Sequence, residues 1–197
     1  MKNKKEILVA SSNLGKIKEF KKLFNSYQIF SLSDFQIDDP IEDGDSFLEN
    51  ALKKAKHGAL SSGMYTIADD SGLVVPDLNF EPGIYSARYA GDNASDKENR
   101  DKIINKLHAK KVKSLDAYYV CILVGIKRFD DPMPLISEGK IYGKVSVNES
   151  GNGGFGYDRI FYPNNFSESM ASISPEIKNE ISHRAIATNE FLEKFNF

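Results

Sequence analysis

The chain has 197 residues, of which 41% are hydrophobic and 27% charged, and its formal net charge is −2. This size suits one domain or two small lobes that share a core, and the near-zero charge argues against a general nucleic-acid binder. One cysteine excludes an internal disulfide, and the longest apolar run, nine residues, is too short to span a membrane, so we expect a cytoplasmic protein.

The first half of the chain alternates predicted strands and helices. In chain order these are strand 6–12, helix 13–26, strand 27–32, acidic loop 33–45, helix 45–60 and two strand-like runs, 64–70 and 72–78, around a turn. Within the second helix, Ser46 and Glu49 fit the pattern of a capping box.

The second half predicts longer strands. In chain order we expect an ordered loop at 76–94, an amphipathic helix at 95–110, a hairpin of strands 116–129 and 133–147, a glycine-rich loop at 148–158 and a closing helix at 174–195. Ser174 is placed to cap the last helix, and Pro175 suits its first position. Helices alternating with strands, followed by long antiparallel strands, predict a mixed α/β fold.

The stretch Ala-Asp-Asp-Ser-Gly-Leu places Asp69 and Asp70 side by side where a buried strand ends. Asp, Ser and Gly all suit turns, so a simple turn is one interpretation. The other interpretation is functional, because adjacent carboxylates repel and are costly to bury unless a cation binds them. In that case the two acids share a cation and a water. Oxygen ligands without nearby His or Cys favour Mg²⁺ over zinc, and Glu42 and Asp43 in the acidic loop would add carboxylates.

The stretch Ser-Ser-Asn-Leu-Gly-Lys joins the first strand to the first helix. Its hydroxyls, free backbone N–H groups and the Lys16 ammonium form a candidate anion site at the positive end of the helix. The alternative is that Asn13 merely caps the helix. The stretch is not a Walker A loop, because Ala10 stands where the first glycine is required and Ile17 follows the lysine.

The stretch Gly-Asn-Gly-Gly-Phe-Gly at 151–156 matches the dinucleotide fingerprint only literally, because an extended segment rather than a helix follows it. Such a loop lets the backbone approach a ligand while Phe155 or Tyr157 stacks on a base. A β-bulge or tight hairpin is the alternative. In the last helix, Lys178 and His183 would lie about 140° apart if that helix were continuous.

Taken together, these segments resemble the inosine triphosphate pyrophosphatase family, also called Ham1-like. The segments that carry the resemblance follow one another along nearly the whole chain: SSNLGKIKEF, EDGDSFLENALKKA, ADDSGLVV, EPGIYSARYAG, GGFGYDRIF and SPEIKNEISHR. Arg159 departs from the proline usual in the family, and residues 76–81 depart from its usual loop sequence.

The resemblance implies a single domain, 1–197, built as an elongated two-lobed mixed sheet flanked by helices, with the active cleft between the lobes. It also implies a homodimer and a Mg²⁺-dependent nucleoside triphosphate pyrophosphatase. Such an enzyme hydrolyses ITP, dITP and XTP to the monophosphate and pyrophosphate, which cleans the nucleotide pool. Neither nucleic acid nor a membrane is an expected partner.

The resemblance further implies the roles of individual residues. Asp70 would be the catalytic carboxylate, and Glu42 and Asp70 would bind the metal. Substrate-binding residues would be Ser11, Ser12, Asn13, Leu14, Gly15, Lys16, Ser71, Phe155, Gly156, Tyr157, Asp158, Lys178, His183 and Arg184. Two alternatives remain: a nucleotide-binding regulator that does not hydrolyse, and a pyrimidine-directed house-cleaning pyrophosphatase.

Overall fold

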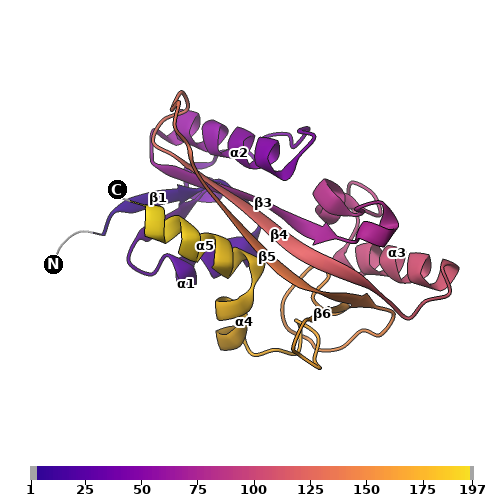
Figure 1. Cartoon of the computed structure of the whole chain (residues 1–197). Helices are drawn as coiled ribbons and strands as arrows, with labels where there is room; N and C mark the ends of the chain where they lie inside the picture. Colours follow the sequence, from indigo (N-terminus) through magenta and orange to yellow (C-terminus); the bar gives the residue numbers. More distant parts are fainter. Residues whose placement is uncertain (1–3, 196–197) are drawn as a thin grey trace. The chain divides into compact units, whose positions relative to one another are not determined.

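The computed structural model describes residues 4–195. They form a mixed six-stranded sheet flanked by helices, with the strand order β2-β1-β3-β4-β5-β6 (Figure 1). The strands are β1 (Glu6–Val9), β2 (Gln28–Ser31), β3 (Thr66–Val74), β4 (Ser114–Ile126), β5 (Leu135–Ser146) and β6 (Phe161–Pro163). The helices are α1 (Leu14–Leu23), α2 (Phe47–Ser62), α3 (Asp96–Ala109), α4 (Pro175–Ile181) and α5 (His183–Lys194). The predicted α/β class is confirmed.

The sheet contains both strand directions. β1 pairs in parallel with β2 and with β3, whereas β5 and β6 pair antiparallel. Leu8 pairs with Thr66 and Val9 with Ile67, so the residues that follow β1 lie beside residues 68–70, in the middle of β3.

The chain divides into two compact units. The first consists of Met1–Asp70, Cys121–Gly139 and Arg184–Phe197, and the second of Ser71–Val120 and Lys140–His183. Three strands, β3, β4 and β5, each contribute residues to both units. One domain with two lobes and a cleft between them stays a prediction.

The core of the first unit has two layers, set by the alternation of side chains along β1. Ile7 and Val9 pack with aromatic residues of α1 and α5, whereas Leu8 and Ala10 pack with the alanines of α2. Figure 1 shows the same arrangement, with α2 on one side of β1 and both α1 and α5 on the other. Successive side chains of a strand point to opposite faces, so each residue's position decides which helix it meets.

Buried apolar residues of α3, β4 and the segment after the glycine-rich loop form the core of the second unit. Two of its helices, α3 and α4, begin with serine caps, and the cap at Ser174 was predicted from the sequence. The Ser95 hydroxyl accepts a hydrogen bond from the Glu98 N–H, and the Ser174 hydroxyl accepts one from Ile177. Within residues 4–195, the structure contains no helix with both the length and the apolar character needed to cross a bilayer.

Two predicted elements differ from the structure. The stretch at 69–72 is not a turn, because β3 runs without interruption from Thr66 to Val74. The predicted helix at 174–195 is two helices, since Ser182 adopts an extended conformation between α4 and α5, with φ −67° and ψ 153°. Serine is favoured at such positions before a helix, so the break agrees with its chemistry.

Candidate active site

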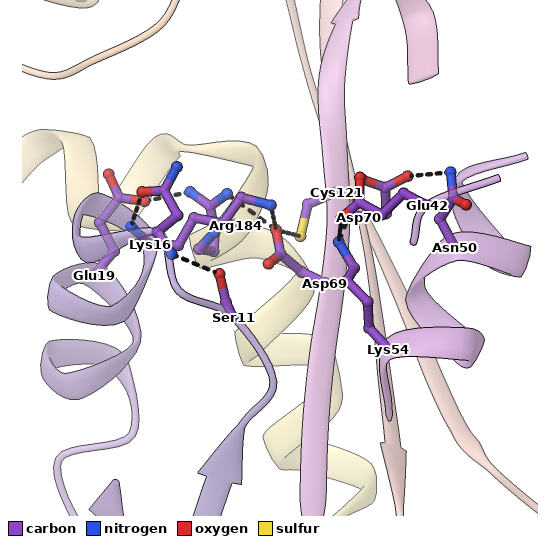
Figure 2. Close-up of polar contacts among 11 residues, drawn as sticks. Ser11, Lys16, Glu19, Glu42, Asn50, Lys54, Asp69, Asp70, Cys121 and Arg184 are labelled. Atoms are coloured by element: carbon purple, nitrogen blue, oxygen red, sulfur yellow. Dashed lines mark hydrogen bonds and ion pairs between the residues drawn. The ribbon is translucent and has the colours of Figure 1, made fainter. Parts of the chain in front are cut away.

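The uninterrupted course of β3 separates the two adjacent carboxylates. Ile67 belongs to the layer that packs on α1 and α5, and Ala68 to the layer that packs on α2. By the same alternation, Asp69 meets α1 and α5, and Asp70 meets α2. Figure 2 shows Asp69 against Lys16 and Arg184, and Asp70 against Asn50. Each acid therefore has its own side-chain partners, and a cation shared by the two stays a prediction.

Asp70 is buried among polar side chains of α2 and the acidic loop. The Asn50 side-chain amide donates a hydrogen bond to Asp70 Oδ2 at 3.2 Å, and Lys54 Nζ lies 3.7 Å from Asp70 Oδ1. Lys54 Nζ also donates to Glu42 Oε1 at 2.6 Å. Asn50 Oδ1 accepts a hydrogen bond from the Gly44 N–H at 2.8 Å, which fixes the acidic loop beside Asp70. The spacing of Asn50 and Lys54, one helical turn apart, brings both to Asp70.

Burial and charge act in opposite directions on these groups. Burial raises the pKa of Asp70, because the attraction of Lys54 and Lys16 does not offset the loss of hydration. Burial lowers the pKa of Lys54, but Asp70, Asp69 and Glu42 outweigh it, so the net pKa of Lys54 is raised. Lys54 therefore keeps its proton and its positive charge, and Asp70 is a better proton acceptor than an exposed aspartate.

Asp69 lies on the opposite face, in a fully buried ion-pair network. Its Oδ2 atom is 3.1 Å from Lys16 Nζ and 3.0 Å from Arg184 Nη2. Arg184, whose side chain is 1% exposed, also donates to Glu19. Burial favours the neutral acid, but Lys16, Arg184 and Lys54 outweigh it and hold the pKa of Asp69 far below its ordinary value. Asp69 is therefore charged at neutral pH.

The residues at the start of α1 have the expected capping arrangement. Asn13 Oδ1 accepts from the Lys16 N–H at 3.1 Å, and Ser11 Oγ accepts from the Asn13 N–H at 3.1 Å. The capping interpretation of Asn13 is thus confirmed. An anion site here remains a prediction that the geometry allows, because the Lys16 ammonium lies beside the same helix N-terminus. Of the remaining predicted residues here, Ser12 and Leu14 are exposed and Gly15 is half-buried.

The residues around Lys54 fit a magnesium ion of one particular kind. Among residues 4–195, no three His, Cys, Asp or Glu side chains group as a metal site by themselves. Mg²⁺, however, is commonly held by one or two carboxylates together with substrate phosphates. Glu42 and Asp70 supply two carboxylates that already surround one cationic group, the Lys54 ammonium. The donor set therefore fits a cation site that bound polyphosphate completes.

In the second unit, the predicted residues gather around the Asp158 carboxylate. Asp158 Oδ2 accepts from Lys178 Nζ at 2.8 Å and from the Phe155 N–H at 3.0 Å. The hydroxyl of Tyr119 donates to Asp158 Oδ1 at 3.4 Å, and the Tyr119 ring stacks on His183 with centroids 4.7 Å apart. One buried carboxylate thus orders the glycine-rich loop and the α4 lysine together.

The other predicted residues of the second unit are placed less directly. Tyr157 is buried, and its hydroxyl donates to the Ser86 carbonyl at 2.7 Å. The Gly156 N–H donates to Asp96 Oδ2 at 2.7 Å. Ser71 follows Asp70 in β3 and belongs to the second unit. Substrate binding by these residues stays a prediction.

Sequence reasoning missed Asn50 and Lys54, although a signal was present. The buried face of α2 otherwise carries only alanine and glycine, at Ala51, Ala55 and 58–59. Two polar side chains on such a face are unusual, because buried Lys and Asn need partners.

The predicted capping box at the start of α2 is formed only in part. Ser46 caps the helix, whereas the Glu49 carboxylate accepts from the Asp45 N–H at 2.7 Å.

Gly154 has no room for a side chain beside Asp158. Its φ is +70°, and a Cβ there would overlap Asp158 Oδ2. Gly156 has a similar φ of +61°, yet a Cβ would meet nothing within 4 Å. We expect Gly154→Ala to lower the melting temperature clearly more than Gly156→Ala, because both incur backbone strain and only the first displaces a buried carboxylate. Thermal denaturation of the two variants measures this difference, and equal melting temperatures would contradict it.

Comparisons with known proteins identify the family of this chain. A sequence profile of the Ham1 family matches residues 7–194. A dITP/XTP pyrophosphatase of Legionella pneumophila is 45% identical over 94% of this chain and 96% of its own length. A protein of the same name from Neisseria meningitidis is 46% identical over 96% of each chain. A Ham1 protein structure from Coxiella burnetii superposes with a TM-score of 0.88 at 36% identity, covering 97% of this chain and all of the other. The chain therefore belongs to the Ham1 family.

Proposed function

We propose that this protein is a Mg²⁺-dependent nucleoside triphosphate pyrophosphatase that acts on ITP, dITP and XTP, releasing the monophosphate and pyrophosphate. The observation that carries this proposal is the buried Asp70 carboxylate beside Lys54 and Glu42, in a chain whose relatives are named dITP/XTP pyrophosphatases. The roles of individual residues in this reaction belong to the same proposal.

Asp70 is proposed as the general base. It positions a water and accepts its proton as the oxygen attacks the α-phosphorus, and the bond to the pyrophosphate group breaks. Its burial supports this role, since a raised pKa makes a carboxylate a stronger proton acceptor. Asn50 donates to one oxygen of Asp70, which holds the carboxylate in a fixed orientation.

Glu42 and Asp70 are the proposed ligands of the metal ion. When bound, Mg²⁺ would neutralise charge on the phosphate oxygens as pyrophosphate departs. The Lys54 ammonium already lies between these two carboxylates and keeps them close together despite their repulsion.

The phosphate groups are proposed to bind at Ser11–Lys16, with Ser71 as a further contact. The support is chemical: backbone N–H groups at a helix N-terminus and a lysine ammonium both attract anions. The Lys16 side chain is held at 3.1 Å from Asp69, so its ammonium is already placed at the start of α1.

Residues Phe155–Asp158, Lys178, His183 and Arg184 are proposed to surround the base and the phosphates. Inosine and xanthosine carry an oxygen at position 6, where adenine carries an amino group. The oxygen would accept hydrogen bonds from donors of these residues, whereas the adenine N–H would be left without a partner, which costs about 1–3 kcal/mol or roughly 5- to 150-fold.

The test of this function is pyrophosphate release from ITP, XTP, dITP, GTP and ATP, each with Mg²⁺ and with EDTA. We expect kcat/KM for ITP to exceed that for ATP by roughly 5- to 150-fold. Hydrolysis should disappear with EDTA and return with added Mg²⁺. Equal efficiency for ITP and ATP would defeat the polarity argument, and intact ITP in the presence of Mg²⁺ would defeat the proposed activity.

The same panel separates the alternatives. A non-hydrolysing regulator would bind ITP without releasing pyrophosphate, and a pyrimidine-directed enzyme would prefer pyrimidine triphosphates. The buried polar cluster around Asp70 favours hydrolysis over mere binding, because burying a carboxylate is costly and a regulator gains little from it. A homodimer and a cytoplasmic location stay predictions, to be tested by sedimentation and by fractionation.

A further inference from the structure

We propose that Asp69 is a positioning residue, whose buried carboxylate holds Lys16 and Arg184 in place for polyphosphate binding and does not bind the metal ion. This inference rests on the proposed function. It assigns different tasks to two adjacent aspartates, on the ground that β3 turns them toward different helices.

The contacts of Asp69 support a role through cations. Lys16 comes from α1, Arg184 from α5 and Asp69 from β3, so one carboxylate oxygen joins three elements of the first unit. Figure 2 shows the lysine and the guanidinium converging on that oxygen. Asp69 also has no exposed side-chain surface, which keeps solvent from weakening these pairs.

The position of Lys16 indicates that the ion pairs of Asp69 serve ligand binding as well as stability. Its backbone N–H donates to the side chain of Asn13, which caps α1, and its ammonium pairs with Asp69. A lysine side chain has a flexible stem and loses much rotamer freedom when a ligand immobilises it. Since Asp69 already restrains that side chain, less freedom is lost when phosphate binds.

The other oxygen of Asp69, Oδ1, suggests a competing explanation, in which Asp69 binds a metal ion or a water. Among the described residues, Asp69 Oδ1 has no hydrogen-bond partner, although it is buried. A buried polar atom without a partner invites the idea that a metal ion or water completes it. A metal-binding role and a positioning role predict different results in the absence of metal: replacing Asp69 weakens polyphosphate binding there only if it is a positioning residue.

The experiment measures binding of inorganic tripolyphosphate by calorimetry, in EDTA and again in Mg²⁺, for the wild type and Asp69→Asn. Asp116→Asn is the matched control, because it removes the same charge from a side chain that is 86% exposed. A positioning role predicts roughly 5- to 150-fold weaker binding for Asp69→Asn even in EDTA, from two side chains that must now be ordered by the ligand. Asp116→Asn should bind like the wild type.

Other outcomes overturn the proposal. If Asp69 were only a nearby negative charge, neutralising it would tighten polyphosphate binding, because like charges repel. If Asp69 bound the metal, the loss would appear in Mg²⁺ and be absent in EDTA. A wild type that hydrolyses ITP while Asp69→Asn binds normally would refute this inference alone. A wild type that neither binds tripolyphosphate nor hydrolyses ITP would refute the proposed function itself.

A double-mutant cycle identifies the group through which Asp69 acts. In a Lys16→Gln background, Asp69→Asn should weaken tripolyphosphate binding less than it does alone, since no ammonium remains to be held. Equal effects in both backgrounds would contradict positioning through Lys16.

Asp69→Asn leaves Arg184 with one carboxylate fewer, so a second measurement uses only the wild type. Reductive methylation followed by mass spectrometry reports the reactivity of each lysine. Lys16 should react several-fold more slowly than Lys97, whose side chain is 72% exposed. Equal rates would show that Asp69 does not hold Lys16 in solution.

Discussion

Replacing Asp70 with asparagine is expected to lower kcat by at least about 100-fold, because general-base assistance is typically worth ~10²–10⁴-fold. Asparagine preserves the size of the side chain and its contact with Asn50 but cannot accept the proton of the attacking water. Nucleotide binding measured in EDTA should persist, since Lys16, which is proposed to bind phosphate, pairs with Asp69 instead.

Steady-state pyrophosphate release and calorimetry with ITP measure these two quantities separately. Asp116→Asn again serves as the control for removing one negative charge. A variant that retained more than about a tenth of the wild-type kcat would rule out Asp70 as the base.

Arg184→Ala is expected to be the most destabilising substitution discussed here. It leaves the buried Asp69 and the half-buried Glu19 without their shared guanidinium, and breaking a buried pair such as Arg184–Asp69 from one side costs about 3–5 kcal/mol. For a chain of this size, that corresponds to a fall in melting temperature of roughly 6–20 °C.

The matched control is Arg128→Ala. Arg128 also pairs with an aspartate, Asp130, but its side chain is 74% exposed, and such pairs contribute at most about 1 kcal/mol. Thermal denaturation of both variants under identical conditions measures the contrast. Similar small shifts for the two would mean that the Asp69 network does not support the fold.

Much of the fold follows from local sequence. Capping serines at Ser46, Ser95 and Ser174 mark the starts of three helices, because a hydroxyl oxygen can accept the free N–H groups of the first turn. The uninterrupted apolar run Ile7–Ala10 indicates a strand buried on both faces. These features depend only on residues close together in the chain, so they can be predicted from the sequence alone.

The site was predictable only in part. Asp70 and Lys16 could be singled out as candidate functional residues from their motifs, whereas their partners could not be inferred and Asp70 lies inside β3 rather than at its end. Whether residues 69–72 turn or continue as a strand depends on pairing with distant segments, and tertiary context overrides the turn preference of Asp, Ser and Gly. The burial of Arg184 likewise depends on Glu19 and Asp69, which lie far from it in sequence.

The strand geometry of β3 also bears on how such a protein tolerates changes in length. Inserting or deleting one residue in the five-residue segment Thr66–Asp70, ahead of Asp69, would exchange the faces of the two aspartates, presenting the proposed base Asp70 to Arg184 and Asp69 to Lys54. A single-codon insertion there should be far more harmful than one in the exposed link at 127–132. Over evolutionary time, we expect insertions and deletions to accumulate in such links and to spare this five-residue segment.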